Sequence, residues 1–171
     1  MKHLILAAGL ATLPMAVAAQ DWTGGYGGLA YGGSDIDATG GLTGDGESVG
    51  LFGGYNWDTG DVVYGFEADW DSTDYAIGGG AVNITHTARL KGRIGVDLGA
   101  GLGYATGGIV RANTDALGND NGYLFGLGYD FDLGNNTLLG AEVLQHEFDN
   151  FNGSGTDVSV TTFKARVALK F

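Results

Sequence analysis

The sequence ends with Phe163-Lys164-Ala165-Arg166-Val167-Ala168-Leu169-Lys170-Phe171, in which apolar side chains alternate with mostly charged ones. A period of two places successive side chains on opposite faces of a β-strand, so this strand has one apolar and one polar face. An apolar outer face, a charged inner face and a final aromatic residue are typical of the last strand of a transmembrane β-barrel. The end of the chain therefore predicts the fold of the whole.

Seven further segments have the length and pattern of strands. Five alternate clearly, and they span residues 48–57, 62–71, 84–96, 102–112 and 123–131. Two are weaker: 22–31 is too rich in glycine to assign its faces, and 137–148 has apolar residues on both parities. Eight strands of about ten residues suit tilted spanning strands. We expect an all-β fold, an eight-stranded antiparallel up-and-down transmembrane β-barrel.

The connections between these segments alternate in length. Short, turn-forming stretches occupy 58–61, 98–101 and 132–136, whereas 32–47, 72–83, 113–121 and 149–157 are longer. Short turns on one side and longer loops on the other match the periplasmic and outer surfaces of an outer-membrane barrel. Both ends of the barrel domain are then expected in the periplasm.

Basic residues test the expected strand faces, which were assigned from apolar residues alone. In the strand 102–112, for example, Leu102, Tyr104 and Val110 are assigned outward and Arg111 inward. All seven basic residues after residue 18 then fall on the inward parity, and they are Arg89, Lys91, Arg93, Arg111, Lys164, Arg166 and Lys170. A lipid-facing Arg or Lys near the midplane costs ~2–4 kcal/mol, which explains such a pattern. The alternative, a soluble sandwich, would bury the aromatic face and expose the charged one.

Residues 1–18 predict a secretory signal. A basic residue precedes an apolar run, and an A-x-A pattern follows Pro14. The apolar run is shorter than the ~20 residues of a spanning helix, which argues against a membrane anchor. Residues 19–171 would form the barrel domain, and because the chain has no cysteine, it must be stable without disulfides.

Large aromatic residues lie at the ends of the predicted strands, where aromatic girdles form at membrane interfaces. Trp57 and Tyr129 are expected at the periplasmic side, and Trp70 and Tyr123 at the outer side.

Several segments resemble the small eight-stranded outer-membrane proteins of the OmpA/OmpX type, especially the alphaproteobacterial porin-family barrels. These segments are Asp21-Trp22-Thr23-Gly24, 63–67, 88–95, 104–108, Gly140-Ala141-Glu142 and 166–171. The resemblance implies residence in the outer membrane, among lipid and lipopolysaccharide, and a structural or surface role. It also implies an assembly signal that the barrel-assembly machinery reads, with periplasmic chaperones escorting the chain. That signal would comprise Phe163, Val167, Leu169 and Phe171.

An eight-stranded barrel has room inside for side chains but not for a wide channel. Buried charges must be paired, or their desolvation is not offset. We therefore expect an ion-pair plug that fixes the register and closes the lumen; its members would be Glu67, Asp69, Glu142, Arg89, Arg93, Arg111, Lys164 and Arg166. The alternative is a narrow, porin-like path for ions or small solutes through Glu67 and the arginines.

Catalytic and metal signals are weak. Beyond residue 18 only His86 and His146 are available as bases, and neither has a serine at a suitable spacing on its strand face. Both are expected to be polar interfacial side chains, so no catalytic residue, metal ligand or cofactor is predicted. A lipid-modifying outer-membrane enzyme is the third hypothesis, after a structural or surface protein and a narrow pore. The acidic balance argues against nucleic acid as a partner. We expect a monomer with acidic outer loops. The sequence does not identify a ligand for these loops.

Overall fold

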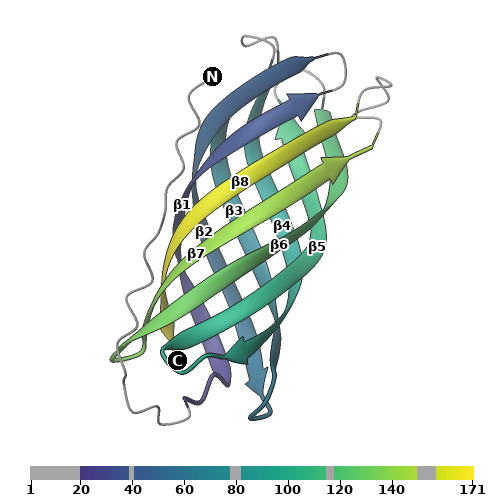
Figure 1. The fold of residues 1–171 in the computed structure, drawn as a ribbon. Helices are drawn as coiled ribbons and strands as arrows, with labels where there is room; N and C mark the ends of the chain where they lie inside the picture. Colours follow the sequence, from purple (N-terminus) through teal and green to yellow (C-terminus); the bar gives the residue numbers. More distant parts are fainter. Residues whose placement is uncertain (1–19, 39–40, 78–81, 115–117, 150–156) are drawn as a thin grey trace, which may run out of the picture.

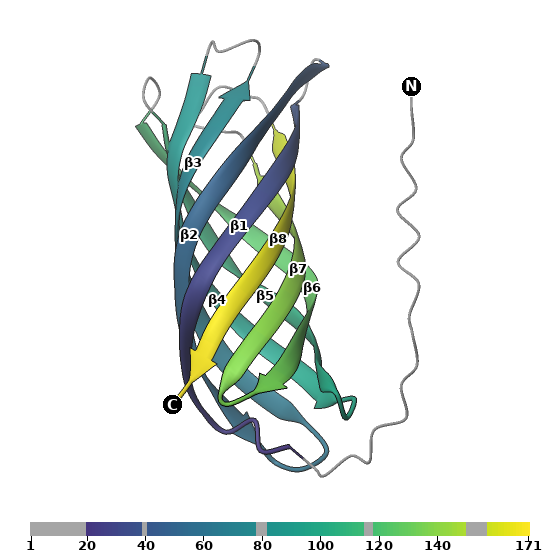
Figure 2. The same cartoon turned by 90° about the vertical axis from the view of Figure 1, so that its left-hand side faces the viewer.

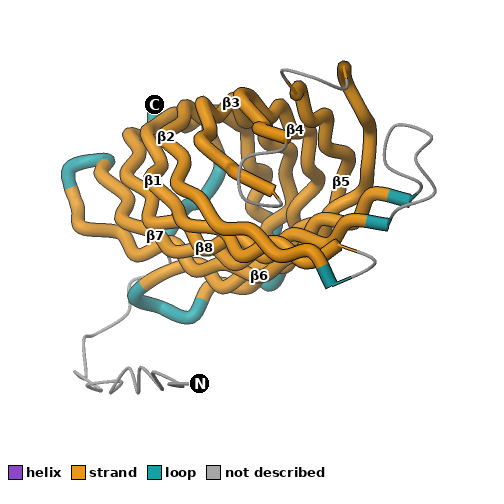
Figure 3. Tube along the Cα trace, turned by 90° about the horizontal axis from the view of Figure 1, so that it is seen from above, coloured by secondary structure: helices purple, strands orange, loops and turns teal. Residues whose placement is uncertain are grey.

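The computed structural model describes residues 20–38, 41–77, 82–114, 118–149 and 157–171. The strands are β1 (Gly24–Ala38), β2 (Leu42–Asp58), β3 (Val63–Ile77), β4 (Val82–Asp97), β5 (Gly101–Thr114), β6 (Gly118–Gly134), β7 (Thr137–Phe148) and β8 (Val158–Lys170). Each pairs antiparallel with the next, and β8 pairs with β1, so the sheet closes into one ring (Figure 3). The predicted eight-stranded antiparallel barrel is confirmed, and a two-sheet sandwich is excluded. The signal predicted over 1–18 lies outside the described residues.

None of the residues that the structure describes forms a helix with the length and hydropathy of a membrane span.

One end of the barrel carries the tight turns and the C terminus, and we call it the turn end (Figures 1 and 2). The β6–β7 turn consists of Asn135 and Asn136, whose φ angles are 52° and 62°. Two consecutive positive φ angles are those of a type I′ hairpin turn, and asparagine tolerates them better than most residues. Phe171 and Gly25 exchange two backbone hydrogen bonds of 2.9 and 3.1 Å at this end, which seals the seam between β8 and β1.

At the opposite end, the loop end, the strands are longer than the sequence predicted. The expected loop 32–47 is largely strand, because β1 continues to Ala38 and β2 begins at Leu42. Ladder pairs such as Asp35↔Asp45 continue there, since backbone hydrogen bonds do not require apolar side chains. Strands of 12 to 17 residues exceed the ~9–11 that span a bilayer, so the wall extends beyond the apolar band. The connecting residues 39–40, 78–81, 115–117 and 150–156 lie outside the described residues.

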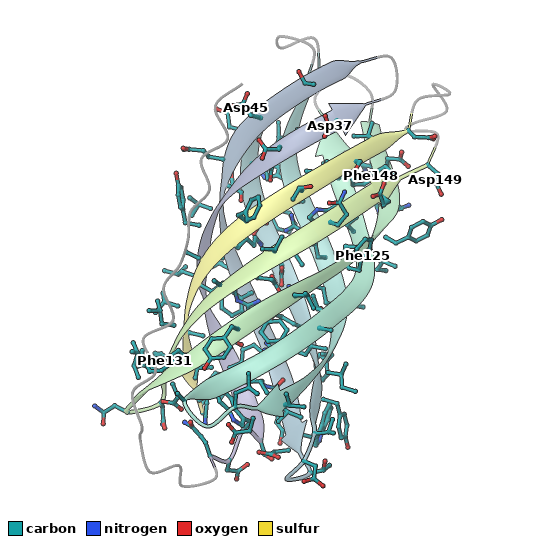
Figure 4. The ribbon with its side chains drawn as sticks, viewed as in Figure 1. Asp37, Asp45, Phe125, Phe131, Phe148 and Asp149 are labelled. Atoms are coloured by element: carbon teal, nitrogen blue, oxygen red, sulfur yellow. The ribbon has the colours of Figure 1, made fainter. Side chains whose placement is uncertain are left out.

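The outer wall of the barrel is apolar over most of its height. Leu127 is 68% exposed, and Figure 4 shows Phe125 and Phe131 on this wall. A continuous apolar surface of this extent is incompatible with water, and a closed ladder leaves no backbone group unpaired in hydrocarbon. The wall is therefore built to contact lipid.

The predicted facing of β5 is wrong. Leu102, Tyr104 and Val110 point into the lumen, with exposures of 0 to 5%, whereas Arg111 is exposed on the outside. The reason is that the lumen contains apolar clusters as well as charges, so an apolar side chain does not by itself mark the lipid face. The loop-end cluster comprises Ile36, Val110, Ala112, Leu124, Leu144, Phe148, Val158 and Val160. The turn-end cluster comprises Trp22, Tyr26, Ala30, Phe52, Val63, Leu102, Tyr104, Leu138 and Ala168.

Candidate functional site

Ten charged side chains are buried in the lumen between the two apolar clusters. Five are basic and five are acidic, and they are Arg89, Lys91, Arg93, Lys164, Arg166, Glu67, Asp69, Asp71, Asp130 and Glu142. Their charges balance, so the net negative charge of the chain lies outside this set. Neighbouring strands β3 and β4 supply six of them through strict alternation, and β6, β7 and β8 supply the rest.

Lys91 occupies the centre of the lumen. Its Nζ lies 2.7 Å from Glu67 Oε1, 3.1 Å from Asp69 Oδ2 and 3.0 Å from Glu142 Oε2. The three carboxylates have oxygens within 4.8 Å of one another, so they would repel strongly without this ammonium group. The sequence placed Lys91 inward but not in the ion-pair plug. The signal was present, because Lys91 shares the parity of Arg89 and Arg93.

Two arginines lie between the centre and the turn end. Arg166 Nη1 and Nη2 donate to the two carboxylate oxygens of Glu67 at 3.0 and 2.5 Å. Arg93 Nη2 donates to Asp130 Oδ2 at 2.6 Å. Each guanidinium also stacks on a ring: Arg93 lies 3.7 Å from the Tyr104 centroid, and Arg166 lies 4.0 Å from that of Phe52. Planar, bidentate and stacked contacts of this kind suit arginine and not lysine.

Two tyrosine hydroxyls complete this layer. Tyr26 donates to Glu67 Oε2 at 3.0 Å and accepts from Arg93 at 2.9 Å. Tyr104 donates to Glu142 Oε1 at 3.3 Å and accepts from Arg166 at 3.0 Å. The sequence missed both, because Tyr26 lies in a strand whose faces could not be assigned and Tyr104 was assigned outward. Tyr104 lies directly opposite Gly128, where a Cβ would collide with the tyrosine ring.

Toward the loop end, Arg89 and Lys164 share the carboxylate of Asp71. Arg89 Nη1 contacts Asp71 Oδ2, and Lys164 Nζ lies 2.8 Å from the same oxygen. Lys164 also reaches Asp69 at 3.5 Å. This layer therefore connects to the centre through Asp69, and the ion pairs form one continuous network.

His146 is buried in this layer, not at a membrane interface as the sequence predicted. Its Nε2 accepts a hydrogen bond from Arg89 Nε at 2.8 Å, so its Nδ1 carries the proton and donates to the Val160 carbonyl at 3.2 Å. Glu142, Leu144 and Phe148 lie on the same inward parity of β7, which explains why this strand turns the histidine inward. His86, by contrast, is exposed on the outer wall and lies 5.6 Å from the ring of Trp70.

Of the eight residues predicted for the plug, the structure brings seven together in the lumen: Glu67, Asp69, Arg89, Arg93, Glu142, Lys164 and Arg166. Arg111 does not join them. It is the exposed member of the seven described basic residues, and it lies on the outer wall between Val110 and Ala112, which point inward.

Residues predicted for the aromatic girdles and the assembly signal lie on the outer wall. Trp57, Trp70 and Tyr123 are exposed, and Tyr129 is half-buried. Phe163, Val167 and Leu169 face outward on β8, and Phe171 is 85% exposed. Their positions suit these roles, which stay predictions.

The loop end is strongly acidic. Asp35 lies opposite Asp45, and Glu47 lies opposite Asp74, in the ladders of β1, β2 and β3. Figure 4 shows Asp37, Asp45 and Asp149 at this end, far from the C terminus. Like charges directly opposite destabilise a pair of strands, so their presence here is not explained by stability.

Comparisons with known proteins agree with this architecture. A family model described as "Outer membrane protein beta-barrel domain" matches residues 4–171. Among solved structures, Neisserial surface protein A (NspA) is 16% identical, with a TM-score of 0.64 over 87% of this chain and 98% of that one.

Two further structures are similar. Ail, the attachment invasion locus protein of Yersinia pestis, is 15% identical, with a TM-score of 0.58 over 87% of this chain and 99% of that one. OprG from Pseudomonas aeruginosa is 17% identical, with a TM-score of 0.52 over 90% of this chain and 98% of that one. No curated protein matches the sequence. Identities this low show a shared fold only.

Proposed function

This chain belongs to the outer membrane protein β-barrel domain family, and we propose that it is a closed barrel with a structural and surface role, not a pore. It resides in the outer membrane, in contact with lipid and lipopolysaccharide. The observation that carries the proposal is the continuous lumen network, with Lys91 at the centre of three carboxylates.

Two kinds of side-chain contact close the lumen, apolar packing and ion pairs. Apolar clusters lie toward both ends of the described lumen. The ion-pair network lies between them and overlaps the turn-end cluster, where Arg93 and Arg166 stack on Tyr104 and Phe52. An ion that crossed would have to lose its hydration shell in the apolar clusters and displace short, multiply bonded ion pairs at the centre. This argument favours a structural plug over the narrow, porin-like path.

We assign the loop end to the cell surface. The strands there extend past the apolar band and carry the acidic residues, whereas the turn end carries short turns, as in outer-membrane barrels generally. The acidic residues of the loop end, which project from the membrane in this orientation, are Asp35, Asp37, Asp45, Glu47, Asp74 and Asp149. Their charge is complementary to that of a basic partner.

Planar-bilayer recording tests the closed lumen. We expect no discrete conductance steps from the purified, folded protein. Discrete steps that change size or selectivity in Arg166→Gln would establish the pore and overturn the proposal, provided that the variant still migrates as a folded, heat-modifiable band.

A deletion strain tests the envelope role. We expect greater sensitivity to detergents and bile salts than in the parent, with full rescue by the wild-type gene. Equal sensitivity of the two strains would remove the envelope role and leave surface interaction alone.

The enzymatic alternative has little support. In the described part of the chain, His146 is held in the lumen by Arg89 and Val160, and His86 lies against Trp70. A lipid-modifying enzyme needs a base that reaches a nucleophile at the membrane border. Mass spectrometry of lipid A from cells with and without the protein tests this reading, and identical spectra are expected.

A further inference from the structure

Arg111 is the described basic residue whose side chain lies on the outer wall and not in the lumen. In the described residues, the other six Lys and Arg side chains each have a carboxylate within 4.0 Å, whereas Arg111 has none and is exposed. A guanidinium on the lipid-facing parity of a barrel strand is unfavourable in hydrocarbon, so its position in the membrane needs an explanation.

Its height along the strand places it at a membrane interface. Arg111 lies ten residues beyond Gly101, where β5 begins at the turn end. At ~3.4 Å per residue and a tilt of ~40°, this corresponds to about 26 Å along the membrane normal, close to the ~25 Å height of the apolar band. Arg111 therefore lies where headgroups begin at the loop end.

Two aromatic residues support this depth. In the ladders, Trp70 lies opposite Ala88 and Ala88 lies opposite Arg111, while Tyr123 is separated by one residue from Asn121, the partner of Arg111 on β6. The Tyr123 hydroxyl donates to Asp149 at 3.3 Å, so its polar end points toward water. Tryptophan and tyrosine prefer the interface, where one end is apolar and the other is hydrated.

An open groove of about 460 Å³ crosses the outer wall beside Arg111. Its lining includes Ala88, Leu90, Ile109, Arg111, Asn121 and Tyr123, and it is mostly apolar. The aliphatic side chains of Leu90 and Ile109 line it and are more than half exposed, and they lie on the turn-end side of Arg111 along β4 and β5. The groove therefore combines an apolar channel at acyl-chain depth with one cation at headgroup depth, and its volume falls within the ~300–1,000 Å³ of ligand sites.

We propose that this groove binds one outer-leaflet lipid, with a lipid A phosphate on the Arg111 guanidinium and an acyl chain along Leu90 and Ile109. We choose a phosphate-bearing lipid because its charge complements that of Arg111. Guanidinium and phosphate match in charge and in planar hydrogen-bond geometry, and the apolar side chains of Leu90 and Ile109 favour an anion that carries an acyl chain. The proposal goes beyond the structural role and rests only on the orientation that places the loop end outside.

Binding of purified lipid A to the folded protein in a non-ionic detergent tests the proposal, with native mass spectrometry as the readout. We expect one lipid per barrel. Arg111→Gln should weaken binding about tenfold, as loss of a charge-assisted hydrogen bond predicts, and Arg111→Lys should weaken it less. Arg111 is exposed and outside the lumen, so the variants should fold, which heat modifiability checks.

A second pair of variants tests the groove independently of charge. Ile109→Trp fills the channel and should weaken binding by a similar factor, whereas Leu51→Trp adds the same bulk to exposed outer wall and should leave binding unchanged. Lipid A without its phosphates should bind the wild type as weakly as intact lipid A binds Arg111→Gln. Inorganic phosphate at the same concentration should not compete.

Three results would overturn the proposal: equal binding by wild type and Arg111→Gln, a stronger preference for phosphatidylglycerol than for lipid A, or a protein dimer cross-linked through the groove. Because this assay is done in detergent, it is independent of the conductance and deletion experiments. Surface labelling of a cysteine introduced at Asp37 in intact cells tests the orientation separately.

Discussion

Arg166 on β8 and Glu67 on β3 face each other across the lumen and form a two-pronged ion pair, with N–O distances of 2.5 and 3.0 Å. Their strands are not neighbours, since β1 and β2 lie between them in the ring. The pair therefore connects two parts of the barrel wall that the sheet's own hydrogen bonds do not join directly.

Replacing Glu67 should destabilise the barrel strongly. Glu67→Ala leaves Arg166, Arg93 and Lys91 with fewer acceptors in a buried site, and loss of one member of a buried pair costs about 3–5 kcal/mol. Urea unfolding followed by tryptophan fluorescence, with the heat-resistance of the folded band on a gel, measures the loss. Asp61→Ala, in an exposed short turn, is the control and should change little. An unaltered unfolding midpoint for Glu67→Ala would show that the plug is not structural.

Removing Lys91 should make the barrel depend on divalent cations. Lys91→Ala leaves Glu67, Asp69 and Glu142 with oxygens within 4.8 Å of one another, at a cost of about 3–5 kcal/mol. Such a group of carboxylates suits Ca²⁺, so millimolar Ca²⁺ should raise the melting temperature of this variant and a chelator should lower it again. Lys170→Ala is the control, because the Lys170–Asp132 pair is longer, at 3.7 Å, and less buried. A variant that melts like the wild type in both conditions would contradict this prediction.

Gly128 should tolerate no side chain. Its Cβ would enter the space of the Tyr104 ring, which is fixed by Arg166 and Glu142, so Gly128→Val should cost about 1–3 kcal/mol through overpacking. Gly107→Val is the matched control on the neighbouring strand, since the nearest atom to its Cβ would be 3.7 Å away. Denaturant titration of both variants makes the comparison, and equal midpoints would count against a tight Tyr104 site.

Phe171 should matter for assembly more than for stability. Its side chain is 85% exposed, and its hydrogen bonds with Gly25 are made by the backbone, so Phe171→Ala should fold normally from urea into detergent. In cells, the same variant should yield several-fold less folded protein in the outer membrane, if the assembly machinery reads this residue. Phe131→Ala, another outward phenylalanine near the turn end, is the control. Equal amounts of the two variants in the outer membrane would assign the signal elsewhere.

Alternation in the sequence predicted the barrel, its closure and most strand faces, because lipid imposes a strong penalty on charge. In β4, for example, Arg89, Lys91 and Arg93 alternate with Ala88, Leu90 and Ile94, and no other register would keep the cations out of hydrocarbon. Seven of the eight residues that this rule predicted for the plug lie in it, and they are seven of the ten charged residues that the lumen contains.

The rule failed at β5 for a physical reason. It assumes a polar lumen, but Leu102, Tyr104 and Val110 fill apolar clusters inside the barrel. On the lipid face of this strand only Ile109 is a large apolar residue, and small residues such as Ala105 and Gly107 fill the turn-end half. Arg111 was then assigned inward by default. The strand lengths were also underestimated. Outside the apolar band, backbone hydrogen bonds alone hold neighbouring strands together, so the side chains there need not alternate between apolar and polar, and the sequence gives no sign of the strand.

The backbone bonds between Gly25 and Phe171 have a consequence for protein engineering. Because β1 and β8 are already neighbours at the turn end, a short peptide linker joining them would alter no strand pairing. A circular permutant opened between β5 and β6 should therefore rebuild the same ring from a different starting strand.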